Sequence, residues 1–153
     1  MIGRYLEDFK IGEEFITPQR TIHLHDITQF CNLTWFNLSI FYDENYIKEN
    51  TVWKNYVVPG PFLIALALGL YLKLGLYEKT IIALLGIENM NFKNPLIAGE
   101  TMKTIVKVLN IRKSTKNPDR GIIHLQFIVK KSDNTFVMSF EMYHLLKCRG
   151  HNK

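Results

Sequence analysis

Two histidines separated by one residue, His23 and His25, are the side chains of this chain best suited to acid–base chemistry. Imidazole titrates near neutral pH, so it can act as a general acid or base. The surrounding sequence, rich in Thr and Ile, predicts a strand over residues 15–24. Alternation along that strand would place both histidines at its end, on one face. A solvent-facing role is the simpler interpretation, and a catalytic role is the alternative.

The other reactive side chains form no recognisable motif. Tyr42 carries a phenol whose ordinary pKa is about 10, which makes it a poor base at neutral pH. Cys31 lies in an apolar helical pattern, and we expect it to be a core thiol. The histidines and cysteines do not have the spacing of a metal-binding motif. The sequence therefore predicts neither a metal site nor a cofactor.

An apolar run over residues 57–72 contains Pro59-Gly60-Pro61 and predicts a buried helix from residue 61 to about residue 76. The N–H groups at a helix start have no acceptor within the helix and favour negative charge. Pro61 has no N–H, so Gly60 is the main donor there. The run is shorter than the roughly 20 apolar residues of a membrane span, which favours a core helix.

Four β-prone segments with turn residues between them follow this helix, over residues 80–92, 102–111, 121–131 and 135–146. Before it, Asp26 is well placed to cap a helix, and residues 43–50 have a short, polar helical pattern. One strand, then helices, then four strands predicts an α+β fold with an antiparallel sheet.

The bulk composition is ordinary for a globular protein, with 47% hydrophobic and 22% charged residues. Residues 1–153 are most simply one domain. The net charge of +5 comes from Lys and Arg spread along the chain, which argues against nucleic-acid binding. The same charge would attract the phosphates of a nucleotide-bearing substrate. The chain opens without a secretory pattern, and we expect a cytoplasmic location and no membrane attachment.

Residues 33–46, L-T-W-F-N-L-S-I-F-Y-D-E-N-Y, have the shape of a hydratase active-site loop. They resemble the T-G-D-x-N-P-x-H-x-D-x-x-Y segment of the MaoC-like family of (R)-specific enoyl-CoA hydratases and dehydratases. Phe36 falls where the family has its catalytic Asp, and Phe41 where it has its catalytic His. Moving the alignment by one residue puts Ile40 in the His position. Three residues match the pattern: Thr34, Asp43 and Tyr46.

Five further segments are similar to the family in order and spacing: residues 5–12, 21–30, 58–62, 92–101 and 118–121. The resemblance covers nearly the whole chain and implies the hot-dog fold, a curved antiparallel sheet wrapped around a long apolar helix. It also implies a dimer joined edge to edge, as a homodimer or as a heteromer with another hot-dog chain. An acyl-CoA thioester would lie between the central helix, the active-site loop and the partner.

The resemblance implies a substrate-binding role for five residues. Gly60 stands at the family's glycine, whose N–H polarises the thioester carbonyl, and Pro59 replaces the usual His beside it. Phe36, Phe41 and Tyr42 would wall an acyl-chain tunnel, or would instead pack on the core or the dimer interface.

The catalytic part of the resemblance is weaker. Hydration of an enoyl thioester needs a base to activate water and an acid to protonate the carbon. Phe36 and Phe41 cannot titrate, so no catalytic residue stands at the family positions. His23 and His25 are the substitutes that the sequence offers.

Three functions in acyl-CoA and fatty acid metabolism therefore compete. The first is a silent or substrate-binding relative of the hydratases, alone or beside an active homologue. The second is an active hydro-lyase of the enoyl-CoA hydratase/dehydratase type, or an acyl-CoA thioesterase, with relocated acid–base residues; the fold cannot choose between them. The third is a structural module without a thioester ligand. The acyl-chain length and the pathway stay open.

Overall fold

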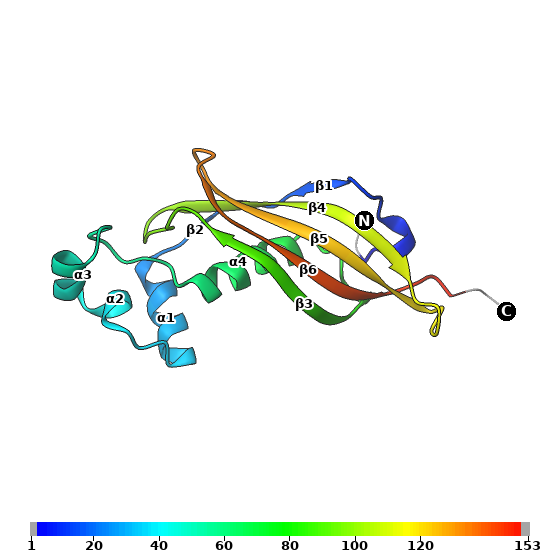
Figure 1. Cartoon of the computed structure of the whole chain (residues 1–153), viewed down its shortest axis with the longest axis horizontal. Coiled ribbons are helices and arrows are strands. Elements are labelled where there is room, and N and C mark those ends of the chain that lie inside the picture. Colours follow the sequence, from blue (N-terminus) through cyan, green and yellow to red (C-terminus); the bar gives the residue numbers. More distant parts are fainter. Residues whose placement is uncertain (1–2, 151–153) are drawn as a thin grey trace.

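A curved antiparallel sheet covers one long helix in the computed structural model, which describes residues 3–150 (Figure 1). The order of the strands is β1–β4–β5–β6–β3, and β2 pairs with β4 beyond the end of β1. The strands are β1 (Glu14–Ile16), β2 (Arg20–Thr21), β3 (Ile81–Phe92), β4 (Thr101–Lys113), β5 (Arg120–Lys131) and β6 (Phe136–Lys147). The predicted α+β class and the four long strands are confirmed. The ends of the predicted domain of residues 1–153 lie outside the described residues.

The inner face of the sheet forms the core because buried and half-exposed residues alternate along β4, β5 and β6. Phe127 of β5 stacks on Phe140 of β6, with 4.9 Å between ring centroids. The ring of Tyr71, from the central helix, meets Phe127 edge-on at 5.6 Å. Each such buried side chain contributes about 1.5–3 kcal/mol by leaving water.

The central helix α4 (Gly60–Leu72) lies against the concave face of the sheet (Figure 1). Its Leu63, Leu66, Ala67, Leu70 and Tyr71 are buried. The helix is shorter than the predicted range of residues 61–76, because the chain turns after Leu72 through a left-handed Gly75. No helix within residues 3–150 is long and apolar enough to cross a membrane.

The strand predicted over residues 15–24 is confirmed only in part, as the two short strands β1 and β2, and its last residues are wrong. The pairing with β4 is interrupted between β1 and β2, where Pro18 has no N–H to donate. Beyond Thr21 the chain enters the helix α1 (Leu24–Thr34). The Asp26 carboxylate accepts the backbone N–H of His23 at 2.9 Å, which stabilises a helix start at Leu24, the last residue of the predicted strand. The capping role predicted for Asp26 is thus confirmed.

Two further helices follow α1 at one end of the sheet: α2 (Ser39–Tyr42) and α3 (Glu44–Asn50). We call α1 to α3, residues 24–50, the overhang; it projects beyond the sheet, at the left of Figure 1. The predicted helix over residues 43–50 is confirmed, and Asp43 caps it by accepting the N–H of Tyr46 at 3.0 Å. A single 3-10 turn, Leu6–Asp8, precedes β1.

Candidate functional site

The start of α4 offers hydrogen-bond donors to a ligand. The first turn closes with a hydrogen bond of 3.1 Å from the Leu63 N–H to the carbonyl of Pro59. The N–H of Gly60 precedes this bond and has no acceptor within the helix. Pro59 is buried and has no side-chain acceptor to cap the turn. The helix start can therefore polarise a carbonyl or bind an anion.

A cavity of about 250 Å³ opens beside this helix start. A Cβ atom on Gly60 would lie 3.2 Å from two ring carbons of Phe92, so the close approach of these residues favours glycine. The cavity is slightly smaller than typical small-molecule pockets of about 300–1,000 Å³, and suits part of a ligand. Its lining is mostly apolar: Trp53, Val57, Val58, Gly60, Leu63, Phe92, Lys93, Asn94 and Pro95.

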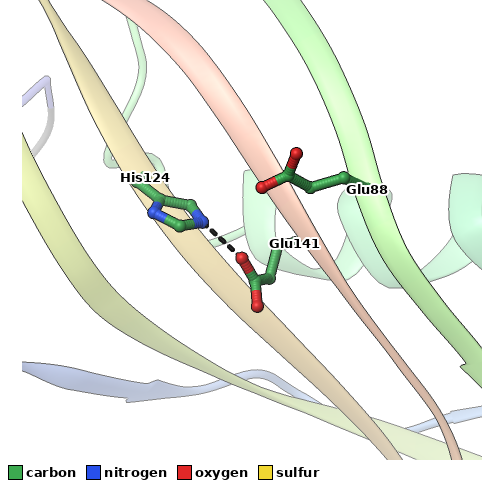
Figure 2. Close-up of side chains that lie close together, drawn as sticks. All are labelled: Glu88, His124 and Glu141. Carbon is green, nitrogen blue, oxygen red and sulfur yellow. Dashed lines mark hydrogen bonds and ion pairs between the residues drawn. The ribbon is translucent and has the colours of Figure 1, made fainter.

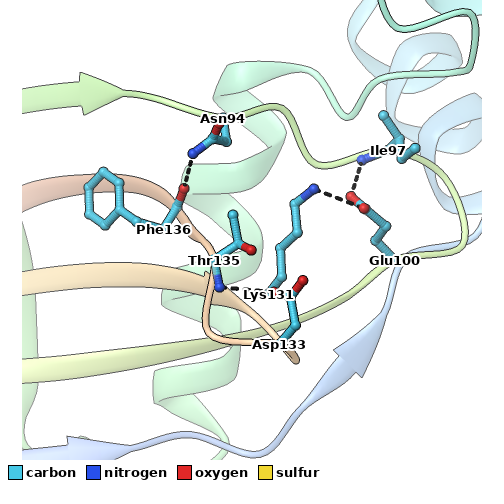
Figure 3. Close-up of polar contacts among 7 residues, drawn as sticks. All are labelled: Asn94, Ile97, Glu100, Lys131, Asp133, Thr135 and Phe136. Carbon is cyan, nitrogen blue, oxygen red and sulfur yellow. Dashed lines mark hydrogen bonds and ion pairs between the residues drawn. The ribbon is translucent and has the colours of Figure 1, made fainter.

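One wall of this cavity belongs to the loop over residues 93–100, which is fixed to the β5–β6 hairpin (Figure 3). The Asn94 side chain donates to the carbonyl of Phe136 at 2.7 Å. Glu100 accepts from Lys131 at 2.8 Å and from the Ile97 N–H at 2.9 Å. The bonds to Phe136 and Lys131 join the loop to the sheet, and the bond to Ile97 holds the loop's own shape, so the cavity wall is preformed.

Four phenylalanine rings connect the overhang to α4, and we call them the phenylalanine cluster: Phe30, Phe36, Phe41 and Phe62. Phe36 and Phe41 lie with their ring centroids 5.1 Å apart. Phe36 meets Phe30 at 6.0 Å, and Phe30 stacks on Phe62 of α4 at 4.6 Å and an interplanar angle of 11°. All four are partly buried against the core. The cluster provides apolar contact and no titratable group.

Two larger hollows lie along the side of α4 that the sheet leaves open. One, of about 750 Å³, lies between α1 and Phe62, and the other, of about 340 Å³, continues along α4 to Lys73. Arg20 lines both and pairs with Asp26 at 2.9 Å. Together these two hollows offer a larger apolar surface beside α4 than the cavity beside Gly60 does.

The structure separates the remaining predicted site residues from this arrangement. His23 precedes α1 and His25 lies in its first turn, both exposed, so their predicted place at a strand end is wrong. Neither lines any of the hollows described above. Tyr42 ends α2 with 58% of its surface exposed, apart from the phenylalanine cluster. Cys31 is buried, and burial raises the pKa of its thiol, which confirms the predicted core role.

Sequence reasoning missed several residues that the fold brings to the site. Phe30 and Phe62 complete the phenylalanine cluster, and Trp53 and Lys93 line the cavity beside Gly60. The helical spacing of Phe30 signals a buried face but does not say what the ring meets. Phe30, Phe62 and Lys93 lie within segments that resemble the family, residues 21–30, 58–62 and 92–101, but nothing in those segments assigns them to a site.

The chain is similar to proteins of known sequence and structure. Protein MaoC of Klebsiella aerogenes is 32% identical over 114 residues, which are 74% of this chain and 32% of that protein. The chain thus spans about a third of its curated relative. A monoamine oxidase regulatory protein from Archaeoglobus fulgius has a TM-score of 0.87 at 23% identity, over 98% of each chain. A MaoC-like dehydratase from Rhodospirillum rubrum has a TM-score of 0.84 at 22% identity, over 97% of this chain and 100% of that one. No family model matches the chain.

Proposed function

Since the chain belongs to the MaoC-like family with the hot-dog fold, we propose that it binds an acyl-CoA thioester without hydrating it. In this proposal the thioester carbonyl accepts the N–H of Gly60, and the acyl end enters the cavity beside it. The positive helix start favours charge on that oxygen. Lys93 at the cavity wall and the net charge of +5 favour the CoA phosphates.

The phenylalanine cluster is the observation that carries the proposal. Phe36 and Phe41, which the sequence resemblance puts at the positions of the family's catalytic Asp and His, pack on each other rather than enclosing a polar site. A buried water needs two to four polar partners, and two phenyl rings offer none. Loss of one general acid or base typically lowers a rate by about 10²–10⁴. With both groups replaced by rings, binding is the activity that the site supports best.

The proposal includes a second hot-dog subunit, either the same chain or a relative, joined along β3. This strand is an edge of the sheet, paired only with β6. Its apolar side chains stay exposed in the single chain: Ile81, Ile82, Leu84, Leu85, Ile87, Met90 and Phe92. A long apolar edge of this kind favours pairing with another strand. Sedimentation of the purified chain measures this, and a monomer that binds CoA esters would remove the partner from the proposal.

The test measures two properties of the purified chain. We expect calorimetric binding of short and medium 2-enoyl-CoA thioesters, with no hydration of them. Gly60→Ala should weaken binding about tenfold, because the added methyl pushes on the Phe92 ring and narrows the cavity. Gly69→Ala in the same helix is the matched control, since its Cβ meets nothing within 4 Å.

Each outcome selects one of the competing functions. Clear hydration or thioester hydrolysis would refute the non-catalytic role; loss of that turnover in a His23→Ala, His25→Ala variant would establish relocated catalysis. A folded chain with no affinity for any CoA ester would refute ligand binding and leave a structural module. Equal weakening by Gly60→Ala and Gly69→Ala would place the ligand elsewhere on α4.

A further inference from the structure

Three side chains with metal-binding atoms converge on the outer face of the sheet (Figure 2). They are Glu88 of β3, His124 of β5 and Glu141 of β6, and their ligand atoms all lie within 4.8 Å of one another. His124 Nε2 is 2.6 Å from a carboxylate oxygen of Glu141. The neighbours of His124 and Glu141 along each strand are buried, so this cluster lies across the sheet from α4 and the cavity beside Gly60.

The strand register fixes these residues together. Glu88 lies directly opposite Glu141, and His124 lies opposite Tyr143, one position further along the same face of β6. A β-bulge directly after Glu88, with Asn89 at φ 52°, changes the direction of β3 at this point. Carboxylates directly opposite each other on neighbouring strands repel, so this pairing favours a cation between them.

Tyr143 orients two of the three side chains. Its hydroxyl donates to Glu88 at 2.5 Å, and its ring stacks on the His124 imidazole at 4.1 Å and 15°. Such outer contacts hold the ligands of protein metal sites in their binding orientation.

We propose that Glu88, His124 and Glu141 bind one divalent transition-metal ion of the zinc class. One imidazole nitrogen with carboxylate oxygens suits Zn²⁺ and its neighbours, whereas Mg²⁺ and Ca²⁺ prefer oxygen alone. Tetrahedral Zn²⁺ with ligands at about 2.1 Å separates them by about 3.4 Å. Ligand atoms that are now up to 4.8 Å apart need to close by up to about 1.4 Å, and His124 and Glu141, now 2.6 Å apart, need to separate by about 0.8 Å. Rotation about the Glu side-chain bonds supplies that movement, and water completes the coordination.

The ion would join the edge strand β3 to β6 and β5. Each of the three strands contributes one ligand, so binding connects β3 to the rigid centre of the sheet. Within the single chain β3 has a neighbour on one side only, so of the three strands that supply a ligand it gains most from such a connection. Metal binding is therefore expected to raise the melting temperature and to leave CoA-ester binding unchanged.

The experiment titrates untagged protein with Zn²⁺ by calorimetry, and with Co²⁺ by its visible absorption. We expect one ion per chain. His124→Ala and Glu141→Gln should each weaken binding at least tenfold, while the isosteric Glu141→Gln keeps the shape of the site. His25→Ala, which removes an exposed histidine outside the site, is the matched control and should bind as the wild type does.

Two results would overturn the proposal. The first is the absence of saturable Zn²⁺ or Co²⁺ binding to folded wild-type protein. The second is binding that survives both His124→Ala and Glu141→Gln, which would place the ion elsewhere. In either case the three residues form only a hydrogen-bonded group on the sheet surface.

Discussion

The buried imidazole of His144 makes the free energy of unfolding of this protein depend on pH. It lies in β6 with 3% of its surface exposed, and its Nδ1 is 3.2 Å from the hydroxyl of Tyr77. Burial lowers the pKa of His144 to about 4, well below its ordinary value near 6.5. The folded protein therefore keeps this imidazole neutral at pH values where the unfolded chain protonates it.

The direction of the effect follows from these two pKa values. Above pH 6.5 both states are neutral at His144, and its contribution to stability is fully present. As the pH falls from about 6.5 to 4, only the unfolded state takes up the proton, so the free energy of unfolding decreases. The free energy of unfolding decreases by about 2 kcal/mol between pH 7 and pH 5. The total decrease reaches about 3 kcal/mol below the folded pKa of about 4, where the folded state also takes up the proton.

Urea unfolding at pH 7, 6 and 5, at one protein concentration and followed by circular dichroism, measures this decrease. His144→Gln keeps a polar side chain near Tyr77 and removes the titration, so its free energy of unfolding should change far less over the same range. Asp8 does not interfere, because its hydrogen bond from Arg149 lowers the pKa of this carboxyl below the range studied. Parallel pH profiles for wild type and His144→Gln would refute the argument.

Two substitutions test the backbone and the packing. Trp35→Gly should raise the free energy of unfolding by about 1 kcal/mol, because Trp35 ends α1 in the left-handed region (φ 58°) with 85% of its surface exposed. Trp35→Ala keeps the strain and serves as control; an equal gain in both variants would contradict the explanation. Gly121→Ala should lower the free energy of unfolding by about 2 kcal/mol, because a Cβ there would lie 2.6 Å from the carbonyl oxygen of Arg112. An unchanged free energy of unfolding for Gly121→Ala would contradict this prediction, because it would mean that β4 and β5 move apart to accept the methyl group.

The long strands were predictable from sequence because their information is local. Residues 80–92, 102–111, 121–131 and 135–146 combine β-prone side chains with turn residues at their ends, and the structure places β3 to β6 there. The strand predicted over residues 15–24 ends early because a second local signal, for a helix start, competes with its β-prone residues. The Thr and Ile residues before His23 favour a strand. The Asp26 carboxylate, however, accepts the N–H of His23 and so caps the start of α1.

The candidate sites were predictable only in part, because they depend on distant segments. Gly60 is marked by its own neighbours, two prolines before an apolar run. The contact of Phe30 with Phe62 joins α1 to α4 and has no signature in either helix. The cluster of Glu88, His124 and Glu141 depends on the register of three strands and on the bulge after Glu88. A one-residue change in register would send such a side chain to the opposite face.

The positions of the histidines bear on whether catalysis has moved rather than disappeared. His25 lies in the first turn of α1, and Phe36 follows the residue that ends this helix. Ten residues of helix at 1.5 Å each separate their backbones by about 15 Å along the axis. A general base must come within about 3 Å of its proton, directly or through one water. From its place in α1, His25 therefore lies too far from Phe36 to act on a group held beside that ring, and catalysis through His25 would need a ligand bound at the other end of the helix.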